Sequence, residues 1–135
     1  MEKDKGFIKD KRLFLLDIDG TVCIGQRLID GTREFLKAVK NSGGQFVFIT
    51  NNSTRSIEDY ILSFQKLGVM TDYTNFITAS FATVQYLKKH YDGKLIYVMG
   101  TKSLLRELKK NKIRVTTDCM DEDIACVLVS YDNQL

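Results

Sequence analysis

A run of apolar residues that ends in two carboxylates constrains this chain more than any other feature. Residues 13–16 read Leu-Phe-Leu-Leu, and Asp17 and Asp19 follow with one isoleucine between them. A continuous apolar run of this kind predicts a strand buried on both faces, as in the parallel sheet of an α/β domain. Because side chains two residues apart point the same way along a strand, Asp17 and Asp19 are expected side by side, unless the chain turns between them.

This carboxylate pair predicts a metal site. No lysine or arginine falls between Asp17 and Thr21. Two carboxylates about 4 Å apart repel by roughly 1 to 4 kcal/mol near water, so a bound cation would stabilise them. Oxygen ligands of this kind suit Mg²⁺. The alternative is a plain turn, because aspartate and glycine both favour turns.

The rest of the chain predicts alternating strands and helices. Apolar residues recur at helical spacing in four segments, 32–40, 57–67, 80–91 and 102–110. Short apolar runs predict strands at 45–50, 76–78, 95–99, 113–116 and 124–129, and residues 22–30 read as a loop. Ser56 and Ser80 are expected to cap the helices that follow them. The alternation is typical of a parallel sheet with right-handed crossovers, so the predicted fold class is α/β with a Rossmann-like sheet.

Composition limits the partners and the compartment. The net charge of +3 over 135 residues is small and dispersed, so nucleic acid is not an expected partner. No apolar run approaches the length that a membrane-spanning helix needs. The three cysteines, Cys23, Cys119 and Cys126, are odd in number and show no metal-type spacing. We therefore expect reduced thiols and a cytoplasmic protein.

Two motifs resemble those of a known family. The segment from Asp17 to Thr21, Asp-Ile-Asp-Gly-Thr, is similar to the first motif of the haloacid dehalogenase-like (HAD) phosphohydrolases. Thr50-Asn51-Asn52 resembles the second motif, where hydroxyl and amide groups hold phosphoryl oxygens. Residues 48–54, 77–80 and 97–100 also resemble the NagD and para-nitrophenyl phosphatase branch, in which an α/β cap follows the third core strand. The resemblance implies that residues 1–79 form the N-terminal portion of a HAD core and that 80–135 begin the cap.

The resemblance implies Mg²⁺-dependent hydrolysis of small phosphate monoesters through an aspartyl-phosphate. Asp17 would be the nucleophile, and Asp19 would protonate the leaving oxygen and later activate water. Both would bind Mg²⁺, Asp19 through its backbone carbonyl. The supporting residues would be Gly20 and Thr21, and the phosphate-binding residues would be Thr50, Asn51 and Asn52. The partner would be a small phosphorylated metabolite; sugar phosphates, nucleotides and pyridoxal phosphate all stay open.

The sequence departs from the family pattern after the second motif. The family's third motif is a lysine and its fourth is acidic, but Lys88 and Lys94 lie in the wrong context and residues 121–123 read as a surface loop. The chain therefore resembles the N-terminal half of a phosphatase, truncated or a natural remnant, and alone it is expected to be inactive. An unfinished cap would leave apolar surface exposed, which favours a homodimer through the cap.

Two other functions stay open. The chain could be a catalytically incomplete interaction or phosphate-binding module. It could also be a phosphoacceptor signalling domain, which would place its acceptor aspartate after the third strand. That strand ends in Ile77-Thr78-Ala79 without an aspartate, which counts against the signalling domain.

Overall fold

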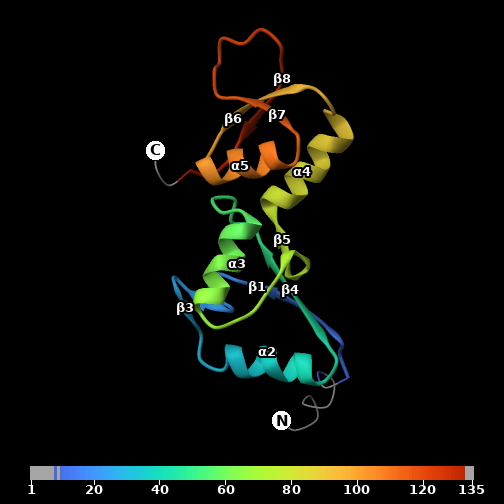
Figure 1. Cartoon of the computed structure of the whole chain (residues 1–135), viewed down its shortest axis with the longest axis vertical. Coiled ribbons are helices and arrows are strands. Elements are labelled where there is room, and N and C mark those ends of the chain that lie inside the picture. The colour runs from blue at the N-terminus through green and yellow to red at the C-terminus, as the bar shows by residue number, and fades with distance from the viewer. Residues whose placement is uncertain (1–7, 9, 133–135) are drawn as a thin grey trace. The chain divides into compact units, whose positions relative to one another are not determined.

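The computed structural model describes residue 8 and residues 10–132 as alternating strands and helices (Figure 1). Contacts divide the chain into two units. The first unit comprises the residues up to Thr50 together with Ile61–Ile77. The second unit comprises Asn51–Tyr60 together with the residues from Thr78 onward. The predicted α/β fold class is confirmed, since each unit contains a three-stranded sheet and helices.

The sheet of the first unit brings the two sequence motifs to one edge. Its strands are β1 (Leu13–Asp17), β4 (Gln45–Thr50) and β5 (Phe76–Thr78), in the order β1-β4-β5. β1 and β4 run parallel. A short 3-10 helix, η1 (Tyr73–Asn75), leads into β5. Because β1 and β4 are parallel neighbours, their carboxyl ends lie at the same edge of the sheet.

Within residues 22–30, where the sequence predicted a loop, the structure forms a small antiparallel hairpin. It pairs β2 (Cys23–Ile24) with β3 (Arg27–Leu28). Each strand has only two residues, which is too short for the alternating pattern that identifies a strand in sequence.

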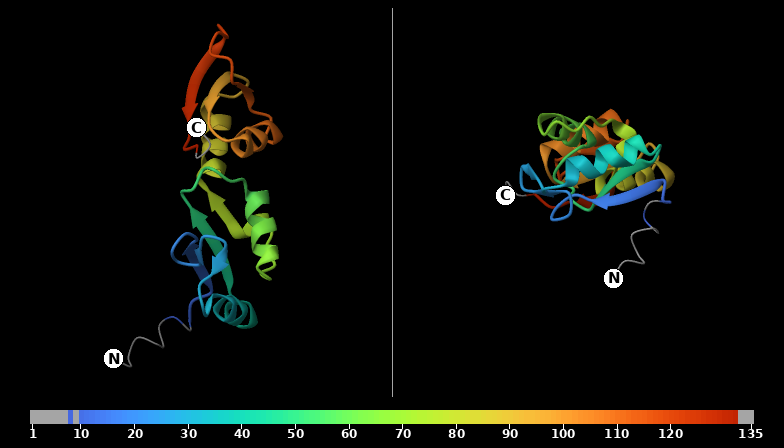
Figure 2. Two further views of the ribbon diagram at one scale, coloured as in Figure 1. Left: turned by 90° about the vertical axis from the view of Figure 1, so that its left-hand side faces the viewer. Right: turned by 90° about the horizontal axis from the view of Figure 1, so that it is seen from below.

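Helices α2 (Thr32–Asn41) and α3 (Ile57–Lys66) cover one face of this sheet through aromatic contacts (Figure 2). Phe35 meets Phe14 edge to face, with ring centroids 5.3 Å apart. Phe64 stacks on Phe48 at 4.5 Å. Such pairs add to the stabilisation from area burial alone. Phe48 and Phe64 are buried in the first unit's core, whereas the pair of Phe14 and Phe35 lies at its edge, with Phe35 38% exposed.

The opposite face of the sheet corrects one prediction. The apolar run of β1 predicted burial on both faces, but Leu13 is 56% exposed and Leu15 is 59% exposed. Ile49 and Ile77, on the neighbouring strands, are exposed as well. In the part of the first unit that the structure describes, α2 and α3 both lie on the other side. Burial on both faces needs a second layer of helices, and a strand's own sequence does not supply one.

The second unit repeats the same architecture. β6 (Leu95–Met99) lies between β7 (Arg114–Thr116) and β8 (Ile124–Val129), and both pairings are parallel. Helices α4 (Ala79–His90) and α5 (Lys102–Lys110) pack on this sheet. The buried core consists of six aliphatic residues, Val84, Leu87, Ile96, Val98, Leu104 and Leu108.

The two predicted helix caps had different outcomes. Ser56 does cap α3, because its Oγ accepts a hydrogen bond from the backbone N–H of Asp59 at 3.2 Å. The prediction for Ser80 is wrong, since the Oγ1 of Thr78 accepts from the N–H of Phe81 at 3.0 Å. Thr78 is the last residue with extended backbone, so its side chain is the one that reaches the free N–H groups of the first turn.

None of the helices among the described residues has the length and apolar character that crossing a membrane requires.

The two faces of the first sheet should respond differently to truncation. Phe48 is fully buried, so Phe48→Ala is expected to lower the free energy of unfolding by about 3 to 5 kcal/mol. Leu15→Ala, on the open face, is expected to cost about 1 kcal/mol or less. Urea unfolding followed by circular dichroism measures both. Equal losses would contradict the exposure of this face.

Candidate active site

The two motif carboxylates lie at the carboxyl end of β1, and the chain turns between them. Asp17 is the last residue of β1. The backbone oxygen of Ile18 then accepts hydrogen bonds from the N–H groups of Val22 at 3.0 Å and Cys23 at 2.9 Å. Ile18 and Val22 are buried, whereas Asp17 and Asp19 are exposed. The apolar side chains therefore fix the turn and leave both carboxylates facing solvent.

The last two motif residues shape this turn. Gly20 has φ +85°, a left-handed conformation that side chains other than glycine rarely adopt. Its N–H donates to the backbone oxygen of Cys23 at 2.7 Å. Thr21 donates from its hydroxyl to Oδ2 of Asp17 at 3.3 Å. Gly20 thus permits the turn, and Thr21 restrains the carboxylate at which chemistry is expected.

Thr50 ends the neighbouring strand at the same edge of the sheet. In the β1–β4 register Asp17 lies opposite Ile49, one residue before Thr50. Thr50 is buried, whereas Ile49 is exposed, as expected for successive residues of a strand. The structure therefore brings Asp17 and Thr50 close in register within the first unit, as the parallel pairing predicted.

The two asparagines begin the loop that follows β4, and this loop groups with the second unit. Asn51 is exposed. The side-chain oxygen of Asn52 accepts from the N–H of Thr54 at 3.0 Å and from its hydroxyl at 2.7 Å. This turn uses the Asn52 oxygen to fix the loop.

Side chains distant in sequence hold this loop, and no sequence motif had marked them. Thr101 donates from its hydroxyl to the backbone oxygen of Thr54 at 3.2 Å. Ser103 Oγ accepts from the N–H of Ser56 at 2.9 Å. These contacts join residues 47 positions apart, so only the folded chain reveals them.

Acidic side chains beside this loop show opposite pKa shifts. Burial opposes ionisation of Asp59, but hydrogen bonds from Ser103 and Ser56 outweigh it and lower the pKa of the carboxyl. Glu107, on α5, is 6% exposed, and its Oε2 has no hydrogen-bond partner. Desolvation, with the nearby charges of Glu58 and Asp59, raises the pKa of Glu107 to about 7, although Lys110 acts in the other direction.

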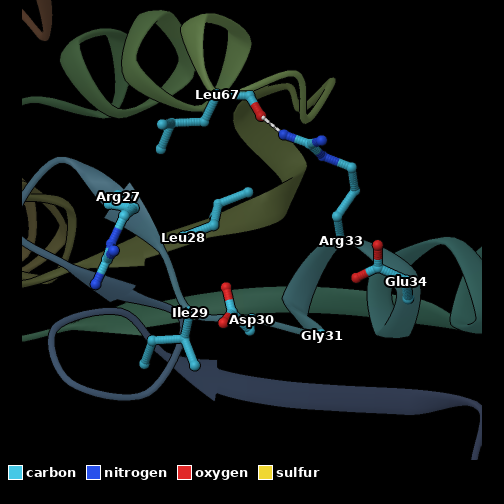
Figure 3. Close-up of a pocket in the computed structure, with 8 residues that line it drawn as sticks. All are labelled: Arg27, Leu28, Ile29, Asp30, Gly31, Arg33, Glu34 and Leu67. Carbon is cyan, nitrogen blue, oxygen red and sulfur yellow. Dashed lines mark hydrogen bonds between the residues drawn. The ribbon is translucent and has the colours of Figure 1, made fainter.

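A cavity of about 540 Å³ lies elsewhere in the first unit (Figure 3). It is lined by residues of β3, the start of α2 and Leu67, and neither motif aspartate is among them. Arg33, on α2, lines this cavity. Its guanidinium donates to the backbone oxygen of Leu67 at 2.7 Å and so contacts the residue that follows α3. The cavity mixes two arginines with two acids, which does not favour an anionic ligand. The motif edge of the sheet remains the candidate site.

The two motif aspartates fit part of a magnesium site. Asp17 offers a carboxylate and Asp19 a backbone oxygen, and oxygen ligands suit Mg²⁺. Among the residues that the structure describes, no group of three His, Cys, Asp or Glu side chains could hold a metal ion. The described chain therefore offers a partial ligand set, with the two aspartates as its members.

Residues 14–114 match the model of the haloacid dehalogenase-like hydrolases, so the chain belongs to that family. The match includes both motifs and extends through α5.

Curated relatives are phosphatases. The chain is 29% identical over 150 residues to phosphoglycolate phosphatase 1A, a chloroplastic protein of Arabidopsis thaliana, covering 98% of this chain and 41% of that protein. It is 31% identical over 109 residues to the sugar-phosphatase AraL of Bacillus subtilis, covering 81% of this chain and 40% of that protein. The chain thus spans less than half the length of these relatives.

Solved structures share the fold. A 4-nitrophenylphosphatase from Thermotoga maritima superposes with a TM-score of 0.80 at 28% identity, over 95% of this chain and 48% of that one. NagD from E. coli superposes with a TM-score of 0.76 at 27% identity, over 92% of this chain and 48% of that one. A glycerol phosphate phosphatase from Mycobacterium tuberculosis, in complex with magnesium, superposes with a TM-score of 0.81 over 93% of this chain and 37% of that one. At 22% identity this likeness shows the fold alone. The predicted resemblance to the NagD and para-nitrophenyl phosphatase branch is confirmed.

The raised pKa of Glu107 predicts a pH dependence of stability. Between its ordinary value of 4.5 and about 7, the folded state binds more protons than the unfolded state at this residue. Stability contributed by protonated Glu107 is therefore lost as pH rises through this window. Glu107→Gln removes the buried charge. Its stability advantage over the unsubstituted chain is expected to grow by about 2 kcal/mol between pH 5 and pH 8.

Urea unfolding at both pH values measures this difference. Glu122→Gln is the matched control, because Glu122 is exposed and its substitution removes the same charge. A Glu107→Gln advantage that stays constant with pH would contradict a buried, proton-binding Glu107.

Proposed function

We propose that this chain carries the nucleophile and phosphate-binding half of a Mg²⁺-dependent phosphatase that hydrolyses small phosphate monoesters through an aspartyl-phosphate. The observation that carries the proposal is Asp17, an exposed carboxylate at the carboxyl edge of a parallel sheet, one register position from Thr50. Ligands of open α/β sheets bind at this edge. Membership of the hydrolase family and the phosphatase names of the relatives support the same reaction class.

Each motif residue then has one role. An Asp17 oxygen forms a bond to phosphorus as the bond to the leaving oxygen breaks. Asp19 gives that oxygen a proton, and then takes a proton from the water that hydrolyses the aspartyl-phosphate and regenerates Asp17. Thr50, Asn51 and Asn52 hold the non-bridging oxygens. Gly20 and Thr21 keep the turn and the Asp17 carboxylate in place.

Asp17, through its carboxylate, and Asp19, through its backbone oxygen, are the residues that would hold Mg²⁺. When bound, the ion offsets the repulsion between a carboxylate and an anionic substrate.

The domain division and cellular setting belong to the proposal as well. Residues 1–79 would be the N-terminal portion of the catalytic core, and 80–135 would begin an α/β cap that selects the organic part of a small phosphorylated metabolite. The cap could also form a homodimer. The cytoplasmic location expected from the cysteines stays a prediction. Among the described residues, Cys23, Cys119 and Cys126 form no disulfide with one another.

A phosphate-binding module without turnover is the second candidate function. The partial metal-ligand set favours it, because no group of three His, Cys, Asp or Glu side chains among the described residues could hold a metal ion. Both candidates require the Asp17 site, and they differ in turnover.

Binding of Mg²⁺ tests the site itself. Isothermal titration of the 135-residue chain is expected to show weak Mg²⁺ binding, because an incomplete ligand set does not enforce the octahedral geometry that Mg²⁺ demands. Asp17→Asn is expected to abolish the binding. Asp121→Asn, in an exposed loop, is the matched control and should leave it unchanged. Equal affinity in Asp17→Asn would remove the site assignment.

Turnover separates the two candidate functions. We expect the 135-residue chain by itself to hydrolyse para-nitrophenyl phosphate at no useful rate. Among the described residues, Asp17 and Asp19 have no further acidic ligands beside them, so Mg²⁺ would be held loosely. The repulsion between the Asp17 carboxylate and the negatively charged phosphate would then be poorly compensated. The assay compares release of para-nitrophenol with and without Mg²⁺. Mg²⁺-dependent turnover that is lost in Asp17→Asn would show that this chain holds a complete site.

A further inference from the structure

The loop after β4 is held by three hydroxyl side chains of its own unit, Thr101, Ser103 and Ser130, which together form a hydroxyl clamp. Thr101 and Ser103 lie at the N-terminus of α5, and Ser130 follows β8. Ser130 donates from its hydroxyl to that of Ser53 at 2.8 Å. With the contacts of Thr101 to Thr54 and of Ser103 to Ser56, the clamp reaches three of the residues between 51 and 56.

Ser103 connects the end of the loop to the first turn of α3. Its Oγ accepts from the N–H of Ser56 at 2.9 Å and donates to Oδ2 of Asp59. Asp59 Oδ2 also accepts from the N–H of Ser56 at 3.0 Å, so the three residues close a ring of hydrogen bonds. Ser56 and Ser103 are both buried. Removal of the Ser103 hydroxyl would leave the Ser56 N–H with Asp59 alone as acceptor. The loss of a hydrogen bond costs more at a buried donor than at an exposed one, because no water replaces the bond.

The clamp depends on a close backbone approach at Gly100. A Cβ at this position would lie 3.1 Å from Cβ of Ser130 and 3.0 Å from Cδ2 of Leu104, tighter than ordinary contacts. Glycine therefore lets the end of β6, the start of α5 and Ser130 converge on the loop. The N–H of Ser130 completes this junction by donating to the backbone oxygen of Met99 at 2.8 Å.

The contacts continue from the clamp to the asparagines. Thr101 holds the backbone of Thr54, and Thr54 in turn donates twice to the side chain of Asn52. We propose that the hydroxyl clamp positions the 51–56 loop for phosphate, and that Ser103 is a positioning residue of the phosphate site. This rests on the proposed function, in which Asn51 and Asn52 hold phosphoryl oxygens. Donors that are fixed before the ligand arrives bind it without an ordering cost.

The experiment uses the 135-residue chain and inorganic phosphate in the presence of Mg²⁺. Amide hydrogen exchange, resolved by NMR, reports the Ser56 N–H without ligand. Amide shifts of Asn51 and Asn52 report phosphate binding. The variants are Ser103→Ala, Ser103→Thr, which restores the hydroxyl, and Thr116→Val, a control that removes a hydroxyl elsewhere in the same unit, where it accepts from the N–H of Asp118.

Ser103→Ala is expected to speed exchange of the Ser56 amide about ten-fold and to weaken phosphate binding about five-fold or more. Ser103→Thr should recover both values, and Thr116→Val should change neither. A role in stability alone would accelerate exchange throughout the β6 core and leave phosphate affinity unchanged in the folded fraction. If Ser103→Ala does not fold, Ser130→Ala, at a half-buried position, removes the clamp's contact with Ser53, and the readout is then phosphate affinity, which is expected to fall.

Two results would overturn the inference: unchanged Ser56 exchange in Ser103→Ala, or unchanged phosphate affinity despite faster exchange. Failure of the proposed function looks different. The unsubstituted chain would then bind no phosphate, or would bind it equally well as Asp17→Asn, before any clamp residue is changed. That result would remove the ligand to be positioned, and the positioning role with it.

Discussion

The parallel pairing of β1 with β4 is the constraint on which the candidate site depends. It places the end of the Asp17 strand one register position from the end of the Thr50 strand. The stacked rings of Phe48 and Phe64 hold α3 against the same sheet. Aromatic packing thus stabilises the sheet whose strand ends carry the two motifs.

The two motifs are stabilised by different means. At Asp17 the turn is local, because Ile18, Gly20 and Val22 form it within a few residues. The loop after β4 instead depends on Thr101, Ser103 and Ser130, which lie far along the chain. The turn of the first motif therefore depends mainly on its own neighbours in sequence. The loop after β4 is contacted by residues of α5 and by residues that follow β6 and β8, so substitutions there can change the conformation of a loop that is distant in sequence.

Two errors in the sequence prediction share a physical origin. The apolar run of β1 predicted burial on both faces, yet Leu13 and Leu15 are exposed because α2 and α3 lie on the other side. A strand's sequence records which residues are apolar, and the neighbouring layers decide which are covered. Ser80 was expected to cap α4, but Thr78 does so because β5 passes into the helix without a connecting loop. Both outcomes depend on how one element meets the next.

The sequence by itself determined the order of the helices and of the strands outside the short β2–β3 hairpin, the α/β class and the two motifs at strand ends. These features follow from short-range periodicity and from residue chemistry, which any segment carries with it. The tertiary structure decided the open face of the first sheet, the hydroxyl clamp on the loop after β4 and the raised pKa of Glu107. Each of these arises from residues distant in sequence, such as Ser56 with Ser103, or Glu58 with Glu107. Proximity of that kind is created by packing, and no local pattern encodes it.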